Sequence, residues 1–183
     1  MHRITVFVLC VFLSVSPVFA QQSTAFADKP AVLTSVGQSA DFEMVRVLLT
    51  RARFDFRTDP LIGAAGLGTA DKTLILVVGG SSKGLGAAGI SAETELERTN
   101  ALIKKAREMG LKIIALHVGG EGRRGTLSDV FVRAAVPASD YVIVVGDGDK
   151  DGLIAGLARS AGIVLQKVDK ISAVSAPLIA AFK

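Results

Sequence analysis

Five short apolar runs alternate along the chain with segments of helical pattern, and this alternation constrains the fold more than any other feature. None of the runs alternates strictly between apolar and polar residues, which is typical of parallel strands covered by helices on both faces. A weaker run at residues 54–57 predicts a short extra strand. The five runs are residues 32–36, 73–78, 112–118, 141–145 and 163–168.

The alternation predicts a single α/β domain over residues 31–183, after a short polar leader at residues 21–30. We expect three layers: a mostly parallel sheet of five or six strands with helices on both faces, of the flavodoxin-like or Rossmann-like type. Ser91 is expected to cap the clearest helix and Gly110 to end it. The expected helices cover about residues 40–52, 92–109, 127–135, 152–161 and 171–180.

Residues 1–20 predict a signal peptide. Arg3 supplies the positive start, residues 4–15 form the apolar core, and the small residues that signal peptidase reads end at Ala20. Cleavage after Ala27 fits the same rule. The apolar run is shorter than the about 20 residues that a membrane-spanning helix needs. We therefore expect export to the periplasm or the extracellular space, with no membrane anchor after cleavage.

Composition excludes several classes of site. The only cysteine, Cys10, lies in the predicted signal, so the mature chain should have no disulfide and no thiolate metal site. Losing Arg3 with the signal lowers the formal net charge of +4 by one unit, which leaves a mildly basic protein. Tryptophan is absent and aromatic residues are 5% of the chain, too few to stack bases, so no nucleic-acid partner is predicted. No cofactor and no metal are predicted either.

Four loops rich in glycine follow the predicted strands. Right-handed crossovers bring all the strand ends to one side of the sheet, which we call the carboxyl edge. Ligands of such sheets bind at this edge, where the strand order reverses, and here that point is expected between the first strand and strand 73–78. Glycine lets backbone N–H groups approach a ligand, and helix N-termini favour an anion. The loops are residues 37–39, 79–89, 117–125 and 146–152.

The sequence therefore predicts a small anionic ligand at the carboxyl edge. Arg123 and Arg124 are adjacent, so one of them is expected to reach the ligand, with solvated surface charge as the alternative. The predicted ligand-binding residues are Gln38, Ser39, Gly80, Ser81, Ser82, Lys83, Gly84, Gly86, His117, Gly120, Arg123, Arg124 and Asp147.

The loop at residues 79–89 fits two sharper motifs. Gly80, Gly84 and Gly86 have a spacing that resembles short-chain dehydrogenases, but that motif should follow the first strand, and no Tyr-x-x-x-Lys pair exists. The same loop contains G-x-S-x-G, a nucleophile elbow centred on Ser82. With His117 and Asp147 at later strand ends, a serine hydrolase is an alternative function. An interaction module of an envelope complex is another.

Residues 147–152 reproduce the opening of a calcium loop, D-x-D-x-D-G. The twelfth position, which should be a bidentate glutamate, is Ala158, and Lys150 adds positive charge inside the loop. We therefore expect Asp149 or Asp151 to cap the following helix instead.

Taken together, these loops resemble a known protein family. The segments at residues 37–39, 79–89, 117–125 and 147–152 are similar to those of a family of short secreted bacterial proteins known only as a domain of unknown function. The similarity covers nearly all of residues 30–183. It implies export and a single α/β domain, and it implies no activity.

Overall fold

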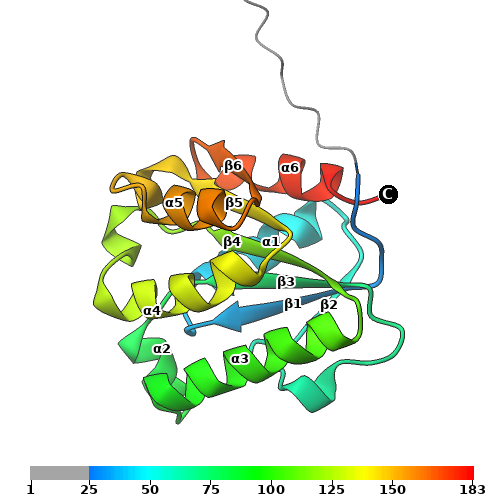
Figure 1. The fold of residues 1–183 in the computed structure, drawn as a ribbon, viewed down its shortest axis with the longest axis horizontal. Helices are drawn as coiled ribbons and strands as arrows, with labels where there is room; N and C mark the ends of the chain where they lie inside the picture. Colours follow the sequence, from blue (N-terminus) through cyan, green and yellow to red (C-terminus); the bar gives the residue numbers. More distant parts are fainter. Residues whose placement is uncertain (1–24) are drawn as a thin grey trace, which may run out of the picture.

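Six parallel strands form one sheet in the order β2-β1-β3-β4-β5-β6 (Figure 1). The computed structural model describes residues 25–183, so the predicted signal peptide lies outside the described residues. The predicted parallel α/β sheet is confirmed. The strands are β1 (Ala31–Val36), β2 (Phe56–Thr58), β3 (Thr73–Val78), β4 (Lys112–His117), β5 (Tyr141–Val145) and β6 (Val164–Val168).

Helices cover both faces of the sheet, which gives the three expected layers. Side chains of α1 and α6 pack against one face, and side chains of α3, α4 and α5 pack against the other. Figure 1 shows α3, α4 and α5 in front of the sheet and α1 behind it. The α-helices are α1 (Asp41–Arg51), α2 (Ser82–Ala87), α3 (Ala92–Glu108), α4 (Thr126–Ala135), α5 (Leu153–Ser160) and α6 (Ser175–Ala180). The short 3-10 helices are η1 (Ala64–Gly66), η2 (Glu121–Arg123), η3 (Val136–Ala138), η4 (Gly146–Asp149) and η5 (Ile171–Ala173).

The apolar runs are buried because the central strands have a helix layer on each side. Every residue of β1, β3 and β5 is buried. For β6 the expectation of cover on both faces is wrong: its residues are exposed or half-buried, and Val164 is 47% exposed. The reason is topological, since β6 is the outermost strand and pairs only with β5 in the described sheet. Its polar residues Gln166 and Lys167 fit that position.

The sequence signals for helix ends predict α3 correctly, but they do not predict α2. The Ser91 hydroxyl accepts the N–H of Thr94 at the start of α3, and Gly110 follows its end with φ of 74°, so both expected caps are confirmed. Inside the glycine-rich loop, Ser81 accepts the N–H of Gly84 at 3.1 Å and caps the start of α2. This helix was not predicted, because its glycines indicate a loop. No helix in the described part of the chain is long and apolar enough to cross a membrane.

The segment before β1 belongs to the fold. Ala27 is fully buried and forms an isolated bridge with Phe182. Its N–H donates to the carbonyl of Ala181 at 2.9 Å, and its carbonyl accepts the N–H of Lys183 at 3.0 Å. Cleavage at the second predicted position, after Ala27, would remove these contacts.

The strand order reverses between β1 and β3, as predicted. β1 lies between β2 and β3, so the chain leaves β1 towards one side of the sheet and returns to the other. All strands are parallel, so their loops meet at the carboxyl edge, towards which the arrowhead of β1 points in Figure 1. This is the region where doubly wound sheets bind their ligands.

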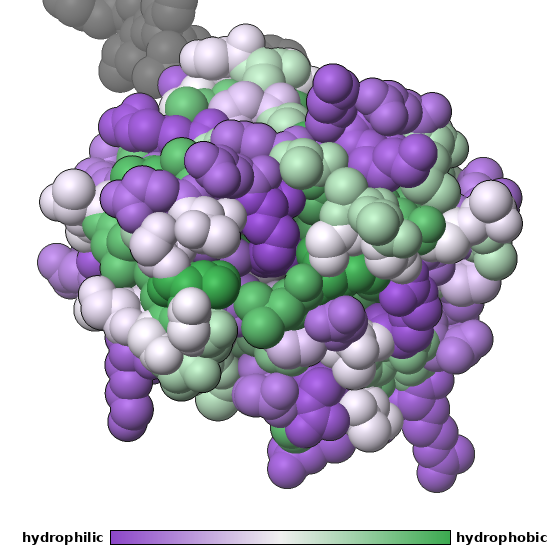
Figure 2. Space-filling model, turned by 90° about the horizontal axis from the view of Figure 1, so that it is seen from below, coloured by the Kyte–Doolittle hydropathy of each residue, from purple (hydrophilic) through white to green (hydrophobic). Residues whose placement is uncertain are grey.

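The surface carries few large apolar side chains. Viewed from below, hydrophilic side chains surround a band of hydrophobic ones (Figure 2). Among the described residues, the exposed large hydrophobic side chains lie on several elements, and only Met44 and Val47 share one, α1. A groove of about 370 Å³ runs beside them, lined by α1 and by Ile171.

Candidate functional site

The loops after β1 and β3 pack directly on each other. Gly37 has φ of 90°, and a Cβ there would lie 2.6 Å from the carbonyl oxygen of Gly79. A Cβ on Gly84 would lie 1.8 Å from the carbonyl oxygen of Gln38, and a Cβ on Gly80 would lie 2.7 Å from Leu127. Gly37 and the predicted ligand-binding residues Gly80 and Gly84 therefore make close packing of these loops possible. Around Gly86, by contrast, a Cβ would meet no described atom within 4 Å.

Glu95 holds the loop after β1 in place. Its carboxylate is fully buried and accepts the N–H of Gly37 at 2.8 Å and the Nε2 of Gln38 at 3.0 Å. Arg98 donates to the same carboxylate from Nε and Nη2, both at 2.7 Å. Gln38 Nε2 also donates to the carbonyl of Pro60 at 3.0 Å. The amide of this predicted ligand-binding residue is therefore engaged in hydrogen bonds within the protein.

The predicted serines divide between structural and exposed positions. Ser81 starts α2, and Ser39 accepts the N–H of Asp41 at 3.1 Å at the start of α1. Ser82 and Lys83 are exposed on the first turn of α2. Ser39 is buried and Ser81 is half-buried, so Ser82 and Lys83 are the exposed members of this group.

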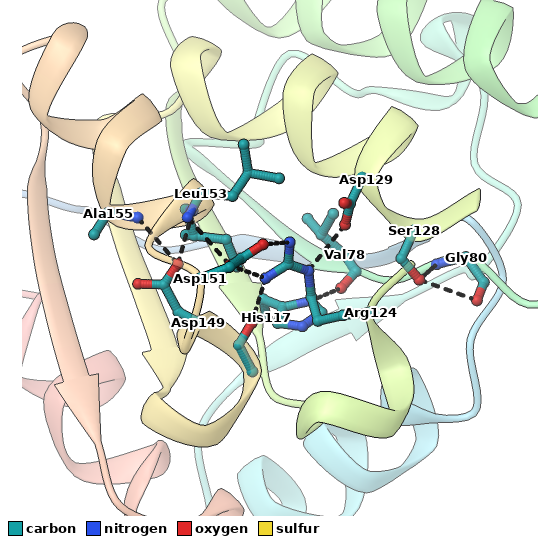
Figure 3. A network of polar contacts seen from close by, with 12 residues as sticks. Val78, Gly80, His117, Arg124, Ser128, Asp129, Asp149, Asp151, Leu153 and Ala155 are labelled. Carbon is teal, nitrogen blue, oxygen red and sulfur yellow. Dashed lines mark hydrogen bonds and ion pairs between the residues drawn. The ribbon is translucent and has the colours of Figure 1, made fainter. Parts of the chain in front are cut away.

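Arg124 is the centre of a network between the loops after β4 and β5 (Figure 3). Its side chain is only 10% exposed. Nε donates to Asp129 at 2.9 Å, Nη1 and Nη2 each donate to Asp151 at 2.9 Å, and Nη1 also donates to the carbonyl of Gly148 at 2.7 Å. The hydrogen bonds with Asp151 and Asp129 raise the pKa of Arg124, and the bond with Arg124 lowers the pKa of Asp151. The donors of Arg124 are therefore engaged in hydrogen bonds within the protein.

His117 ends β4 and is 1% exposed. Its Nδ1 lies 2.9 Å from the carbonyl oxygen of Val78, so Nδ1 carries the proton and donates, and Nε2 is an acceptor. No group of residues 25–183 forms a hydrogen bond with that Nε2. Burial lowers the pKa of the imidazole below its usual 6.5, which the hydrogen bond with Val78 partly opposes. His117 is therefore neutral at pH 7.

The three candidate triad residues have separate partners. His117 binds the carbonyl of Val78, and Asp147 pairs with Lys150 at 2.6 Å, which lowers the pKa of the Asp147 carboxyl. Ser82 lies on the exposed turn of α2. In the described part of the chain, no hydrogen bond joins Ser82, His117 and Asp147 to one another, so the hydrolase has no assembled triad here.

Two aspartates of the loop after β5, Asp149 and Asp151, accept N–H groups at the start of α5. Asp149 Oδ1 accepts the N–H groups of Ile154 and Ala155 at 2.8 and 3.3 Å, and Asp151 accepts that of Leu153 at 3.2 Å. The expected capping of the next helix is therefore confirmed, and both aspartates contribute. No group of three or more His, Cys, Asp and Glu side chains within residues 25–183 is arranged to hold a metal ion.

A hollow of about 200 Å³ lies between the loops after β4 and β5. Lys150 bridges these loops by pairing with Glu121 and Asp147, and a Cβ on Gly120 would lie 2.8 Å from Asp147 Oδ2. Acids outnumber bases in the lining, which does not favour an anion there. The lining residues are Glu121, Arg124, Asp147, Gly148, Lys150 and Asp151.

Asp41, the first residue of α1, and Arg123 form a loose pair. The Asp41 side chain is 8% exposed, and its Oδ1 lies 3.6 Å from the Nε of Arg123, beyond hydrogen-bond distance. Its Oδ2 is buried, and no described residue forms a hydrogen bond with it. A Cβ on Gly119 would lie 2.7 Å from this oxygen, and a Cβ on Gly79 would lie 3.5 Å from it. The carboxylate therefore lies over the ends of the two central strands β3 and β4.

Sequence reasoning placed Arg123 in the site and missed Asp41. An acid in the first turn of a helix is ordinarily explained by the helix dipole. The signal that marks Asp41 is its position at the start of the helix that follows β1, beside the point where strand order reverses.

Comparison with known proteins supplies a family. The model of a family described as Domain of unknown function (DUF6305) matches residues 28–182. The chain belongs to this family. The expected resemblance to a domain of unknown function is confirmed, and the matched region includes every strand of the sheet.

Other comparisons add no activity. No curated protein matches the chain. Among solved structures, a carbohydrate kinase from Agrobacterium tumefaciens is similar at a TM-score of 0.37 and 11% identity. The similarity covers 75% of this chain and 52% of that one, so the chain spans about half the length of the kinase. A likeness at this level carries no conclusion about function.

Proposed function

We propose that the protein binds a small anionic ligand at the carboxyl edge of its sheet and that Arg123 contacts the anion. The observation that carries the proposal is the difference between two adjacent arginines. The Arg124 side chain is only 10% exposed and donates to two carboxylates and a carbonyl. Arg123 is 47% exposed, and its only ion pair within the described residues is the 3.6 Å contact with Asp41.

A guanidinium group with free donors is suited to carboxylate and phosphate groups, which it binds through two parallel hydrogen bonds. Arg123 lies over the end of β4, since a Cβ on Gly119 would meet its Cβ at 2.3 Å. Its partner Asp41 begins the helix after β1, beside the reversal of strand order. This position supports a ligand site by the general behaviour of doubly wound sheets.

Of the other predicted donors, Lys83 and Ser82 support the proposal. Both are exposed at the same edge after β3, where they add a positive charge and a hydroxyl. Gln38, Ser81 and Arg124 are engaged within the fold, so we do not expect them to contact the ligand.

A thermal-shift screen against carboxylates, phosphate monoesters and nucleotides tests the proposal. A ligand at a hundred times its Kd stabilises the folded state by about 2.7 kcal/mol. We expect this stabilisation in the unchanged protein and in Arg133→Gln, a variant of an exposed arginine on α4. We expect it to be lost in Arg123→Gln. A flat screen at millimolar ligand, or an equal shift in Arg123→Gln, would refute the proposal.

A further inference from the structure

We infer that the ligand of this edge also carries a hydrogen-bond donor, a hydroxyl or an ammonium group, and that Asp41 receives it. The inference rests on the proposed function and specifies the class of ligand. It predicts small hydroxy acids, amino acids or phosphate monoesters with a neighbouring hydroxyl or amine, and it predicts weaker binding of simple anions.

The first argument is the state of the Asp41 carboxylate. A buried carboxylate is stable when hydrogen bonds replace its hydration. Asp41 is 92% buried by its side-chain exposure of 8%, yet no hydrogen bond from residues 25–183 reaches either of its oxygens. A carboxylate in this state has open acceptor positions, and a ligand that brings a donor would fill them.

The second argument is the distance between Asp41 and Arg123. A simple anion on Arg123 would lie next to the Asp41 carboxylate, which is 3.6 Å from the same guanidinium. Two negative charges at such a distance repel each other, and the binding of the anion would be weakened. A donor on the ligand makes the interaction with Asp41 attractive instead of repulsive. The donor hydrogen then faces the Asp41 carboxylate, while the anionic group remains on Arg123.

The third argument is the space around the carboxylate. Gly79 and Gly119 carry no side chains, and a Cβ on either would come within 3.5 Å of Asp41 Oδ2. The carboxylate can therefore lie over the ends of the central strands. Ser39 accepts the backbone N–H of Asp41 at 3.1 Å, which holds the start of α1 that carries the carboxylate. A buried acceptor of this kind discriminates between ligands with and without a donor.

Two ligand series with constant anionic groups test the inference. The first is propionate, lactate and alanine, and the second is ethyl phosphate, 2-hydroxyethyl phosphate and phosphoethanolamine. Within each series one hydrogen is replaced by a hydroxyl, which adds a neutral donor, or by an ammonium group, which adds a donor and a positive charge. We expect calorimetric titration to show that the members with a donor bind about tenfold more tightly, or better, than the parent anion in at least one series, as for a hydrogen bond to a charged group.

Variants separate the two proposals. Asp41→Asn should reduce the discrimination within a series to about twofold, and Glu43→Gln, at an exposed position of the same helix, should leave it unchanged. Equal binding of all members of both series, with binding still lost in Arg123→Gln, would overturn the inference and leave the proposed function intact. Absence of binding by every probe, or binding that is equal in Arg123→Gln, would overturn both. The measurements on the unchanged protein decide the inference even if Asp41→Asn does not fold.

Discussion

Glu95 and Asp41 are both buried acids at the carboxyl edge, but they differ in how many hydrogen bonds their carboxylates accept. Glu95 accepts hydrogen bonds from Gly37, from Gln38 and twice from Arg98. Asp41 has the single 3.6 Å contact with Arg123. The first carboxylate therefore joins the loop after β1 to α3, while the second forms no hydrogen bond with the described residues.

The difference shows which part of the edge is structural. Around Glu95 the polar groups and the glycines are used to hold loops together, so a ligand would have to break existing bonds. Around Asp41, by contrast, the carboxylate and the guanidinium of Arg123 are close but do not form a hydrogen bond. Unsatisfied buried groups in native structures require an explanation, and a binding role is one of the few available. The adjacent residues Arg123 and Arg124 repeat the contrast within one loop.

The largest expected effect comes from breaking the Glu95 cluster. Glu95→Gln leaves Arg98, whose side chain is 13% exposed, without its carboxylate. The loss of one partner from a buried ion pair lowers the free energy of unfolding by about 3 kcal/mol or more. Urea denaturation at pH 7 measures this, with Glu97→Gln, an exposed position of α3, as a control expected within about 0.5 kcal/mol of the unchanged protein. A loss below about 1 kcal/mol would mean that the cluster does not stabilise the edge.

A smaller effect is expected from His117, the only histidine within residues 25–183. The folded state holds this imidazole neutral because burial lowers its pKa below 6.5, so the unfolded state binds a proton more readily. The free energy of unfolding should therefore reach its full value above pH 6.5. It should fall as the pH drops below 6.5, by at most about 1.4 kcal/mol per pH unit.

Urea denaturation between pH 7 and pH 5.5 measures the slope. His117→Asn keeps an N–H for the carbonyl of Val78 and cannot titrate, so it should remove the slope in this range. An unchanged slope in His117→Asn would show that other groups set the pH dependence.

The sheet could be predicted from the sequence because its signals are local. Runs of valine, isoleucine and leucine mark β1, β3 and β5 as buried strands, and those residues are buried. The same reasoning failed for β6, because an apolar run indicates strand structure but not how many neighbours the strand has. α2 was missed because Gly84 and Gly86 obscure a helix that Ser81 begins.

The site was predicted only in part because side-chain pairing depends on distant residues. Gln38 meets Glu95 across 57 positions, and Arg124 meets Asp151 across 27. Neither pair follows from periodicity or spacing, so both donors were predicted to face a ligand. The burial of Asp41 likewise depends on glycines at the ends of two other strands. The sequence could indicate the edge, but only the tertiary contacts show which charges remain free.

The smallest effect on stability is expected at Asp41, and it is the sharpest test of the comparison with Glu95. Asp41→Asn removes a buried charge that accepts no hydrogen bond within the described residues, and it gives up one loose pair with half-exposed Arg123. A pair of that kind contributes about 1 kcal/mol or less, while relief of the desolvation penalty acts in the other direction. We expect the free energy of unfolding to stay within about 0.5 kcal/mol or to rise. Urea denaturation beside Glu95→Gln measures it. A loss above about 2 kcal/mol would show that the fold depends on both carboxylates alike, since removal of a satisfied buried charge has an effect of that size.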